Sequence, residues 1–293
     1  ATAASLLGSY YGNASGRALE RALEYEEGLI RHAAVTALER RDLLQNARLI
    51  SPLLYDPVRA VRMEAARALA ALPVDQLQPP SILPVFERAL EEYRKAGTYA
   101  ADFPEGQYNL ANLYNNLGRA EDAERHFRNA IGIDSTLFPA QVNLALLLNQ
   151  LGRNDEAAAL LRAALETEPG SPLVQYNLGR LLAEMTQYPE AARQLERAAG
   201  GMPGHTRVLY NLGLVEQRLG RNDRAAAALD RALAIEPANG EFLYTAAWLA
   251  SMRQDFDAAE AYARRMTANP ETREQGQQLL TAIARSRQGE AGN

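Results

Sequence analysis

The chain has 293 residues, 47% hydrophobic and 23% charged, so it can bury a large core as two globular domains or as one long solenoid. Its formal net charge of -5 argues against a nucleic acid partner, and no apolar run reaches the roughly 18 residues that indicate a membrane-spanning segment. The absence of cysteine excludes disulfides, thiolate metal sites and CxxCH haem attachment in these residues, and it leaves both cytoplasm and periplasm open.

Residues 1–80 contain a short internal repeat. The segment from Leu29 to Leu38 recurs 31 positions later, from Ala60 to Leu69. Ala1 to Leu6 match Ala33 to Leu38 with an offset of 32, so the chain looks like a fragment that begins inside a truncated unit.

The pair Asp56-Pro57 stands just before the second copy. Aspartate favours an N-cap and proline favours a first helical turn, so we expect this pair to start a helix. The alanines that follow allow close packing on a neighbouring helix. The pattern resembles the HEAT-like repeat, which implies HEAT-like helical repeats over 1–80.

A helix from about Ser81 to Ala100 is expected to join two kinds of repeat. Its Ala89, Tyr93 and Ala96 already follow the spacing of the next region, so 81–103 is interpreted as a junction half-repeat. Such a helix lets two solenoids share one continuous core instead of a flexible linker. Prolines bracket the junction at Pro73, Pro79, Pro80 and Pro84.

From residue 104 onward, several residue classes recur every 34 positions. Small residues stand at Ala111, Ala145, Gly179, Gly213 and Ala247, a second series at Ala123, Ala157, Ala191, Ala225 and Ala259, and prolines at Pro169, Pro203 and Pro237. Small side chains allow two helices to cross closely, and proline ends each unit. With Tyr-Asn-Leu-Gly at Tyr176, the pattern resembles the tetratricopeptide repeat.

Five repeats are predicted over 104–273, followed by a C-terminal capping helix and tail over 274–293. A cap is needed because the final unit would otherwise expose an apolar face. The expected fold is therefore all-α, a right-handed α-α superhelix of HEAT-like and tetratricopeptide repeats. The predicted repeats are 104–137, 138–171, 172–205, 206–239 and 240–273.

The first helix of each unit is expected to line a concave groove that binds a peptide or protein segment. Asparagine amides can hold a peptide main chain, and tyrosines add contact area; alternatively, the asparagines bond neighbouring helices and serve folding alone. Arg180 and Trp248 face the same groove, where Arg207 and Arg218 are further cations. The candidate ladder comprises Asn109, Asn143, Asn177, Asn211, Tyr108, Tyr176, Tyr210 and Tyr244.

Other site chemistries find little support in the sequence. The clamp by which tetratricopeptide co-chaperones grip a carboxylate is incomplete, because the single lysine, Lys95, lies outside the five repeats. The three histidines, His32, His126 and His205, have no serine or carboxylate at catalytic spacing, and His126 is expected to be exposed. We expect no enzymatic activity, no metal and no cofactor in this chain.

The order of parts resembles the haem-free C-terminal region of bacterial multihaem cytochromes c. The resemblance rests on Asp56 to Leu69, on the helix containing Glu-Tyr-Arg-Lys, and on the repeats that follow. It implies a docking arm in the periplasm or outside the cell, with haem in a missing N-terminal region and a redox partner or self-association. The alternatives are an accessory module of a larger enzyme and a free tetratricopeptide adaptor or co-chaperone, for which a cytoplasmic location is open.

Overall fold

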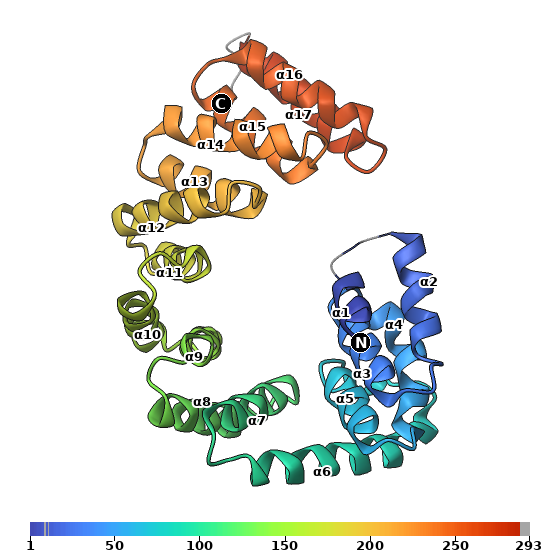
Figure 1. Ribbon diagram of the computed structural model, residues 1–293. Coiled ribbons are helices and arrows are strands. Elements are labelled where there is room, and N and C mark those ends of the chain that lie inside the picture. The colour runs from blue at the N-terminus through green and yellow to red at the C-terminus, as the bar shows by residue number, and fades with distance from the viewer. Residues whose placement is uncertain (9, 11, 288–293) are drawn as a thin grey trace. The chain divides into compact units, whose positions relative to one another are not determined.

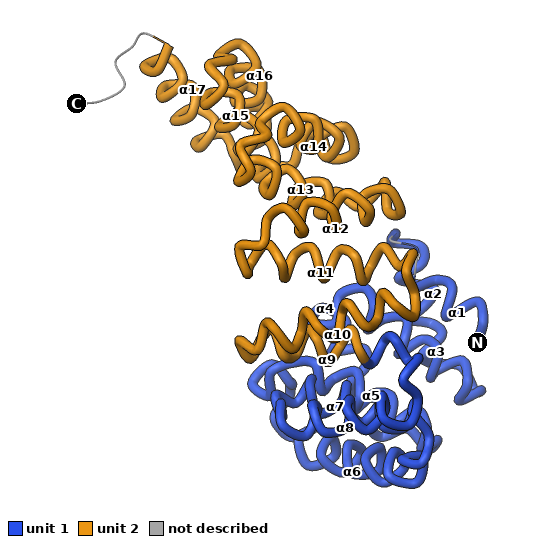
Figure 2. The backbone as a smooth tube through the Cα atoms, turned by 90° about the vertical axis from the view of Figure 1, so that its left-hand side faces the viewer, with its two compact units in different colours: residues 1–140 blue, residues 141–293 orange. Residues whose placement is uncertain are grey.

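The computed structural model describes residues 1–8, 10 and 12–287, and all regular structure in these residues is helical (Figure 1). The predicted all-α class is confirmed. The chain forms two compact units, residues 1–140 and residues 141–293 (Figure 2). This boundary falls inside a helix of the repeat array, whereas the change of repeat type was predicted at 81–103. Each unit is described by itself.

Unit 1 is a stack of helices in which chain neighbours pack on one another. The α-helices are α1 (Thr2–Leu7), α2 (Asn13–Ala22), α3 (Gly28–Glu39), α4 (Leu43–Ile50), α5 (Arg59–Leu69), α6 (Leu83–Tyr99), α7 (Pro104–Asn116) and α8 (Ala120–Ile133). Short 3-10 helices are η1 (Ser51–Tyr55), η2 (Val74–Gln76) and η3 (Pro80–Ile82). One apolar core runs from Ala4 through Phe86 and Ala89 of α6 to Leu113 of α7. The junction helix α6 therefore shares its core with the helices on both sides.

The expected helix start at Asp56-Pro57 is wrong. Helix α5 begins at Arg59, and Val58 is its N-cap residue. The Asp56 carboxylate instead accepts two hydrogen bonds from the guanidinium of Arg31, at 2.7 and 2.8 Å, and one from the backbone N–H of Val58 at 2.8 Å. Asp56 and Arg31 are both buried, so their pairing outweighs the local capping preference that the sequence suggested.

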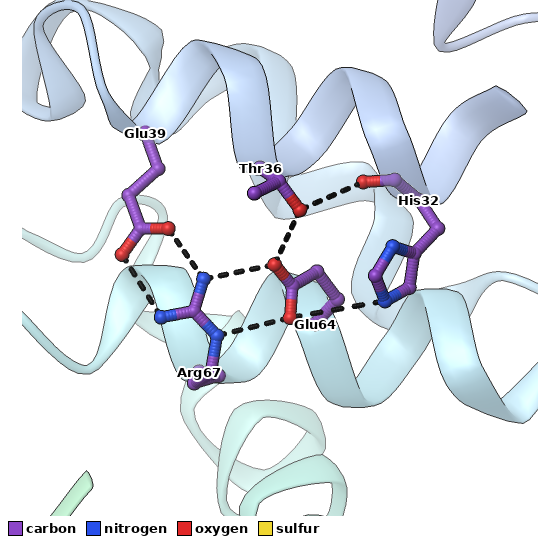
Figure 3. A network of polar contacts seen from close by, with 5 residues as sticks. All are labelled: His32, Thr36, Glu39, Glu64 and Arg67. Atoms are coloured by element: carbon purple, nitrogen blue, oxygen red, sulfur yellow. Dashed lines mark hydrogen bonds and ion pairs between the residues drawn. The ribbon is translucent and has the colours of Figure 1, made fainter. Parts of the chain in front are cut away.

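A network of charged side chains joins α3 to α5 (Figure 3). Arg67 Nε donates to Glu64 Oε2 at 2.9 Å, and Arg67 Nη1 donates to Glu39 Oε1 at 3.1 Å. The hydroxyl of Thr36 donates to Glu64 Oε1 at 2.6 Å, and His32 Nε2 lies 3.9 Å from Glu64 Oε2. Because Arg67 satisfies two carboxylates at once, it fixes the register between the two helices.

Burial opposes ionisation of Glu64, but the hydrogen bonds from Arg67 and Thr36 outweigh it and hold the pKa of that carboxyl below its usual value. Burial likewise opposes the charge of Arg67, and its bonds to Glu64 and Glu39 raise its pKa above the ordinary value. The network therefore stabilises the ionised forms of Glu64 and Arg67.

Unit 2 holds helix pairs at the predicted spacing. Its helices are α9 (Phe138–Gln150), α10 (Asn154–Thr167), α11 (Pro172–Glu184), α12 (Tyr188–Gly201), α13 (Thr206–Arg218), α14 (Asn222–Ile235), α15 (Gly240–Met252), α16 (Phe256–Ala268) and α17 (Arg273–Arg287). The part of α9 that belongs to unit 2 begins at residue 141. Each predicted 34-residue repeat contains one pair, beginning with α7 and α8 in unit 1. Helix α17 buries Ile283 against Ala259 and Ala263 of α16, in the position predicted for the cap. The predicted tail from 288 to 293 lies outside the described residues.

Small residues stand where the two helices of a pair cross. A methyl group added to Gly179 of α11 would lie 2.8 Å from Leu195 Cγ on α12, closer than packed carbon atoms approach. The equivalent addition at Gly213 of α13 would lie 3.0 Å from Leu229 Cγ on α14. The 34-residue series of small residues therefore follows from the distance between paired helices.

Replacing Arg67 by methionine should destabilise unit 1 by about 3 kcal/mol, because two largely buried carboxylates lose their counter-charge. Arg59→Met on the same helix is the matched control. Arg59 is more exposed and its nitrogen lies 3.8 Å from Glu92, so its loss should cost less than about 1 kcal/mol. Native-state hydrogen exchange of the α3 and α5 amides measures both. Equal losses in the two variants would contradict a special role for Arg67.

The cost of Arg67→Met should shrink as the solution becomes acidic. In the wild type, Glu64 has a lowered pKa in the folded state, so its contribution is complete above the unfolded pKa of about 4.3 and is lost as pH falls. In the variant, protonation relieves two unpaired carboxylates. The difference in free energy of unfolding between variant and wild type should therefore narrow from about pH 7 to about pH 4. A difference independent of pH would show that packing, not charge, accounts for the loss.

Candidate functional site

Helices α11, α13 and α15 of unit 2 are the first helices of three successive pairs (Figure 1). A cleft of about 490 Å³ is lined by residues of these three helices. Arg180, Leu214 and Trp248 line it from positions 34 residues apart, so they occupy the same place in three successive units. Glu184 and Arg218, also 34 residues apart, line it one helical turn further on. The repeat geometry thus places two rows of side chains in one cleft.

Large apolar side chains face this cleft without being covered. Leu214 is 37% exposed, Trp248 42% and Tyr244 48%. Exposed apolar residues are common singly, whereas a group of them in a concave place is typical of a binding site. The cleft therefore has apolar surface that remains exposed to solvent in the folded chain.

The charged side chains of the cleft differ in how they are paired. Glu184 Oε2 accepts a hydrogen bond from Asn149 Nδ2 at 2.8 Å, and Glu184 Oε1 lies 3.8 Å from Arg180 Nη1. Arg218 has no ion pair or side-chain hydrogen bond among the residues that the structure describes. Its guanidinium keeps five donors and a full positive charge available to a ligand.

Three predicted ladder residues, Tyr176, Tyr210 and Asn211, form hydrogen bonds between successive repeats. Asn211 Nδ2 donates to the hydroxyl of Tyr176 at 3.2 Å, across a separation of 35 residues. The hydroxyl of Tyr210 lies 3.2 Å from Thr245 Oγ1, again 35 residues away. These bonds favour the structural alternative for part of the ladder, because they link one repeat to the next.

Asn177 and Tyr210 are directed into the protein. The Asn177 side chain donates to the backbone carbonyl of Leu173 in its own helix at 3.0 Å, and the residue is 8% exposed. Tyr210 is also 8% exposed and stacks on Phe242, with ring centroids 4.9 Å apart. Burial raises the pKa of Tyr210. Asn143 lies half-buried on α9.

Tyr108 and Asn109 lie on α7 of unit 1, where they line a cleft of about 300 Å³ together with Arg67 and Tyr93. Of the ten residues predicted from the sequence, the structure brings Arg180, Asn211, Tyr244 and Trp248 together in the cleft of unit 2. Arg218, expected among the cations of the groove, also lines this cleft, whereas Leu214 and Glu184 were not predicted. Leu214 stands 34 residues from Arg180 and from Trp248, and Glu184 stands 34 residues before Arg218, so the spacing could have pointed to both.

The expectation that His126 is exposed is wrong. His126 Nδ1 lies 2.7 Å from Gln107 Oε1, and its ring stacks on Tyr114 with centroids 5.2 Å apart. The half-buried position lowers the pKa of His126 through desolvation and the nearby charge of Arg125. An imidazole on the second helix of a pair can thus pack back on the first.

Over the described ranges, no three histidine or carboxylate side chains converge as ligands for a metal ion. Within the same ranges, no helix is both long and apolar enough to cross a bilayer.

Fold and cleft together define an α-solenoid built of helix pairs with an open concave site. Family models described as tetratricopeptide repeat match residues 104–129, 117–181, 148–212 and 206–239. Residues 104–239 are therefore tetratricopeptide repeats, and the last match coincides with the fourth predicted unit. The fifth predicted repeat, 240–273, lies outside these matches and contains the pair α15 and α16.

Solved structures with this fold match about two thirds of this chain. YrrB, described as a tetratricopeptide protein with an unusual peptide-binding site, has 18% identity and a TM-score of 0.55, over 63% of this chain and 95% of its own. MamA from Desulfovibrio magneticus RS-1 has 18% identity and a TM-score of 0.52, over 63% and 96%. PilF of Pseudomonas aeruginosa has 20% identity and a TM-score of 0.50, over 68% and 95%. No curated protein sequence matches the chain. At these identities the likeness shows the fold alone.

The bond between Tyr176 and Asn211 should contribute to the stability of unit 2. A double-mutant cycle with Tyr176→Phe and Asn211→Ala should give a coupling energy of about 1 kcal/mol, the usual net value of such a hydrogen bond. Hydrogen exchange of the α11 and α13 amides measures it. Strictly additive losses would mean that the two side chains do not interact and that Asn211 is free to serve a ligand.

Proposed function

We propose that the chain is a protein-interaction scaffold and that the cleft of unit 2 binds a segment of a partner protein. The observation that carries this proposal is the grouping of three exposed apolar side chains with an unpaired guanidinium on three successive helices. Tryptophan, tyrosine and arginine are the residues that most often dominate binding energy at protein interfaces. Trp248, Tyr244 and Arg218 bring all three types into one site.

The dimensions and polarity of the cleft favour a peptide segment. A volume of about 490 Å³ accommodates a few side chains, and the cleft is open to solvent along the row of helices. An apolar side chain of the partner would pack on Trp248 and Leu214. The Gln217 amide can bond to the main chain of the partner, and Arg218 would attract a carboxylate.

The similarity to YrrB supports this choice only in part. That protein is described as having an unusual peptide-binding site, and its likeness to this chain is one of fold. The cleft residues are therefore proposed as binding residues on the basis of their exposure and contacts in this chain.

Replacing Trp248 by alanine should weaken peptide binding at least about tenfold, because the side chain is the largest apolar contact in the cleft. Peptides selected from a random displayed library against the full chain serve as ligands, and fluorescence anisotropy gives their dissociation constants. Ile235→Ala on α14 is the matched control, because Ile235 is 46% exposed and Trp248 42%, but Ile235 does not line the cleft.

The control should bind the selected peptides as the wild type does. If Trp248→Ala and Ile235→Ala bind equally well, the peptides bind elsewhere and the cleft is not the site. Failure to select any peptide would also contradict the proposal.

The finer predictions from the sequence remain proposals. These are the HEAT-like character of 1–80, the docking arm of an exported multihaem cytochrome, and an accessory role in a larger enzyme. The contacts of the cleft are equally compatible with the cytochrome docking arm and with the accessory role in an enzyme. A haemochrome spectrum of the natural full-length gene product tests the cytochrome setting: a c-type haem signal would support it, and a haem-free spectrum would contradict it.

A further inference from the structure

Helices α6 and α7 of unit 1 meet at a corner of the chain (Figure 1). Two aromatic side chains are exposed at this corner. Tyr99, the last residue of α6, is 89% exposed, and Phe103, just before α7, is 65% exposed. We call residues 99–103 the aromatic corner. Folding leaves both rings in water, although each could stabilise the protein if it were buried.

No later corner of the array carries two aromatic side chains that are not histidine, although some carry aliphatic ones. The positions equivalent to Tyr99 hold Ile133, Thr167, Gly201 and Ile235, and those equivalent to Phe103 hold Leu137, Ser171, His205 and Asn239. Ile133 and Ile235 are 48% and 46% exposed, against 89% for Tyr99. The repeat fold therefore does not require aromatic rings at these places. Their presence in the first corner calls for a reason other than folding.

The aromatic corner is held rigidly. Gln107 Nε2 donates to the carbonyl of Ala101 at 2.9 Å, and the N–H of Phe103 donates to the carbonyl of Ala100 at 3.0 Å. Gly106 is required below the corner, because a Cβ there would lie 2.0 Å from the oxygen of Ala100. A rigid presentation of exposed rings lowers the entropy cost of binding.

The charge of the corner is negative. Residues 96–107 contain Asp102 and Glu105 and no lysine or arginine. Asp102 is exposed and has no ion pair or side-chain hydrogen bond within the described part of the chain. The corner thus combines two aromatic rings with a free carboxylate, which is the chemistry that Trp248, Tyr244 and Arg218 would accept in the cleft of unit 2.

We infer that the chain associates with a second copy of itself by placing the aromatic corner of one molecule in the cleft of the other. This inference rests on the proposed function of the cleft and names its occupant. Tyr99 and Phe103 would pack against the Trp248 side of the cleft, and Asp102 would pair with Arg218. The two surfaces differ, so the contact is of the head-to-tail kind, which adds molecules one after another.

Sedimentation equilibrium of the full chain tests the inference. A contact of this small size should be weak, so the mean mass of the wild type should rise between about 1 and about 500 µM. Two variants each remove one side of the contact. The corner variant carries Tyr99→Ser and Phe103→Ser, and the cleft variant carries Trp248→Ala and Arg218→Glu.

Each variant alone should remain monomeric over this range, with a dissociation constant raised at least about tenfold. An equimolar mixture should form a heterodimer, because the corner variant keeps its cleft and the cleft variant keeps its corner. This complementation also shows that both variants are folded. Asp102→Arg combined with Arg218→Glu should restore association that either change alone weakens. Arg231→Glu, an exposed change of equal charge outside the cleft, should have no effect.

A wild type that stays monomeric at the highest concentration, or a mixture that fails to associate while the wild type does, would overturn the inference. Its failure is distinguishable from failure of the proposed function. If the chain is monomeric but selected peptides still bind the wild type and not Trp248→Ala, the cleft binds another protein and only the second-copy inference falls.

Discussion

The close crossing of the two helices in each pair is the constraint on which the array depends. At Gly179 and Gly213 there is no room for a methyl group beside the leucine of the facing helix. Because the crossing recurs every 34 residues, the side chains at equivalent positions of successive units point in the same direction. The rows of side chains that line the cleft are a consequence of this repetition.

Function is expected where a row departs from what packing requires. Tyr176 and Tyr210 both bond to the following repeat, whereas Tyr244, at the same position in the last pair, is 48% exposed. The partners of Tyr176 and Tyr210, Asn211 and Thr245, each lie 35 residues further along the chain. The residue 35 positions after Tyr244 is Leu279 of α17, whose side chain cannot accept or donate a hydrogen bond. The end of the array thus leaves a tyrosine available that earlier repeats use internally. Trp248 lies beside it, one helical turn along α15.

Much of the fold could be predicted from the sequence, because helix periodicity and the 34-residue spacing are local signals. The helix pairs, the small residues at the crossings and the helix α17 all lie where the pattern indicated. Contacts between distant residues could not be predicted in the same way. The direction of Asn177 toward Leu173, the pairing of Asp56 with Arg31 and the packing of His126 on Tyr114 each depend on geometry that one sequence does not contain. For the same reason the asparagine ladder was assigned as a whole, although its members make different contacts.

The central claim is that a partner segment contacts the cleft of unit 2, and Trp248 provides a direct probe. The chain contains a single tryptophan, so its indole N–H gives one side-chain signal in a ¹H–¹⁵N NMR spectrum. Titration with a selected peptide should shift this signal in proportion to the fraction of protein bound, because the ligand packs on the indole ring. An indole signal that stays unchanged when the peptide saturates the protein would contradict the account.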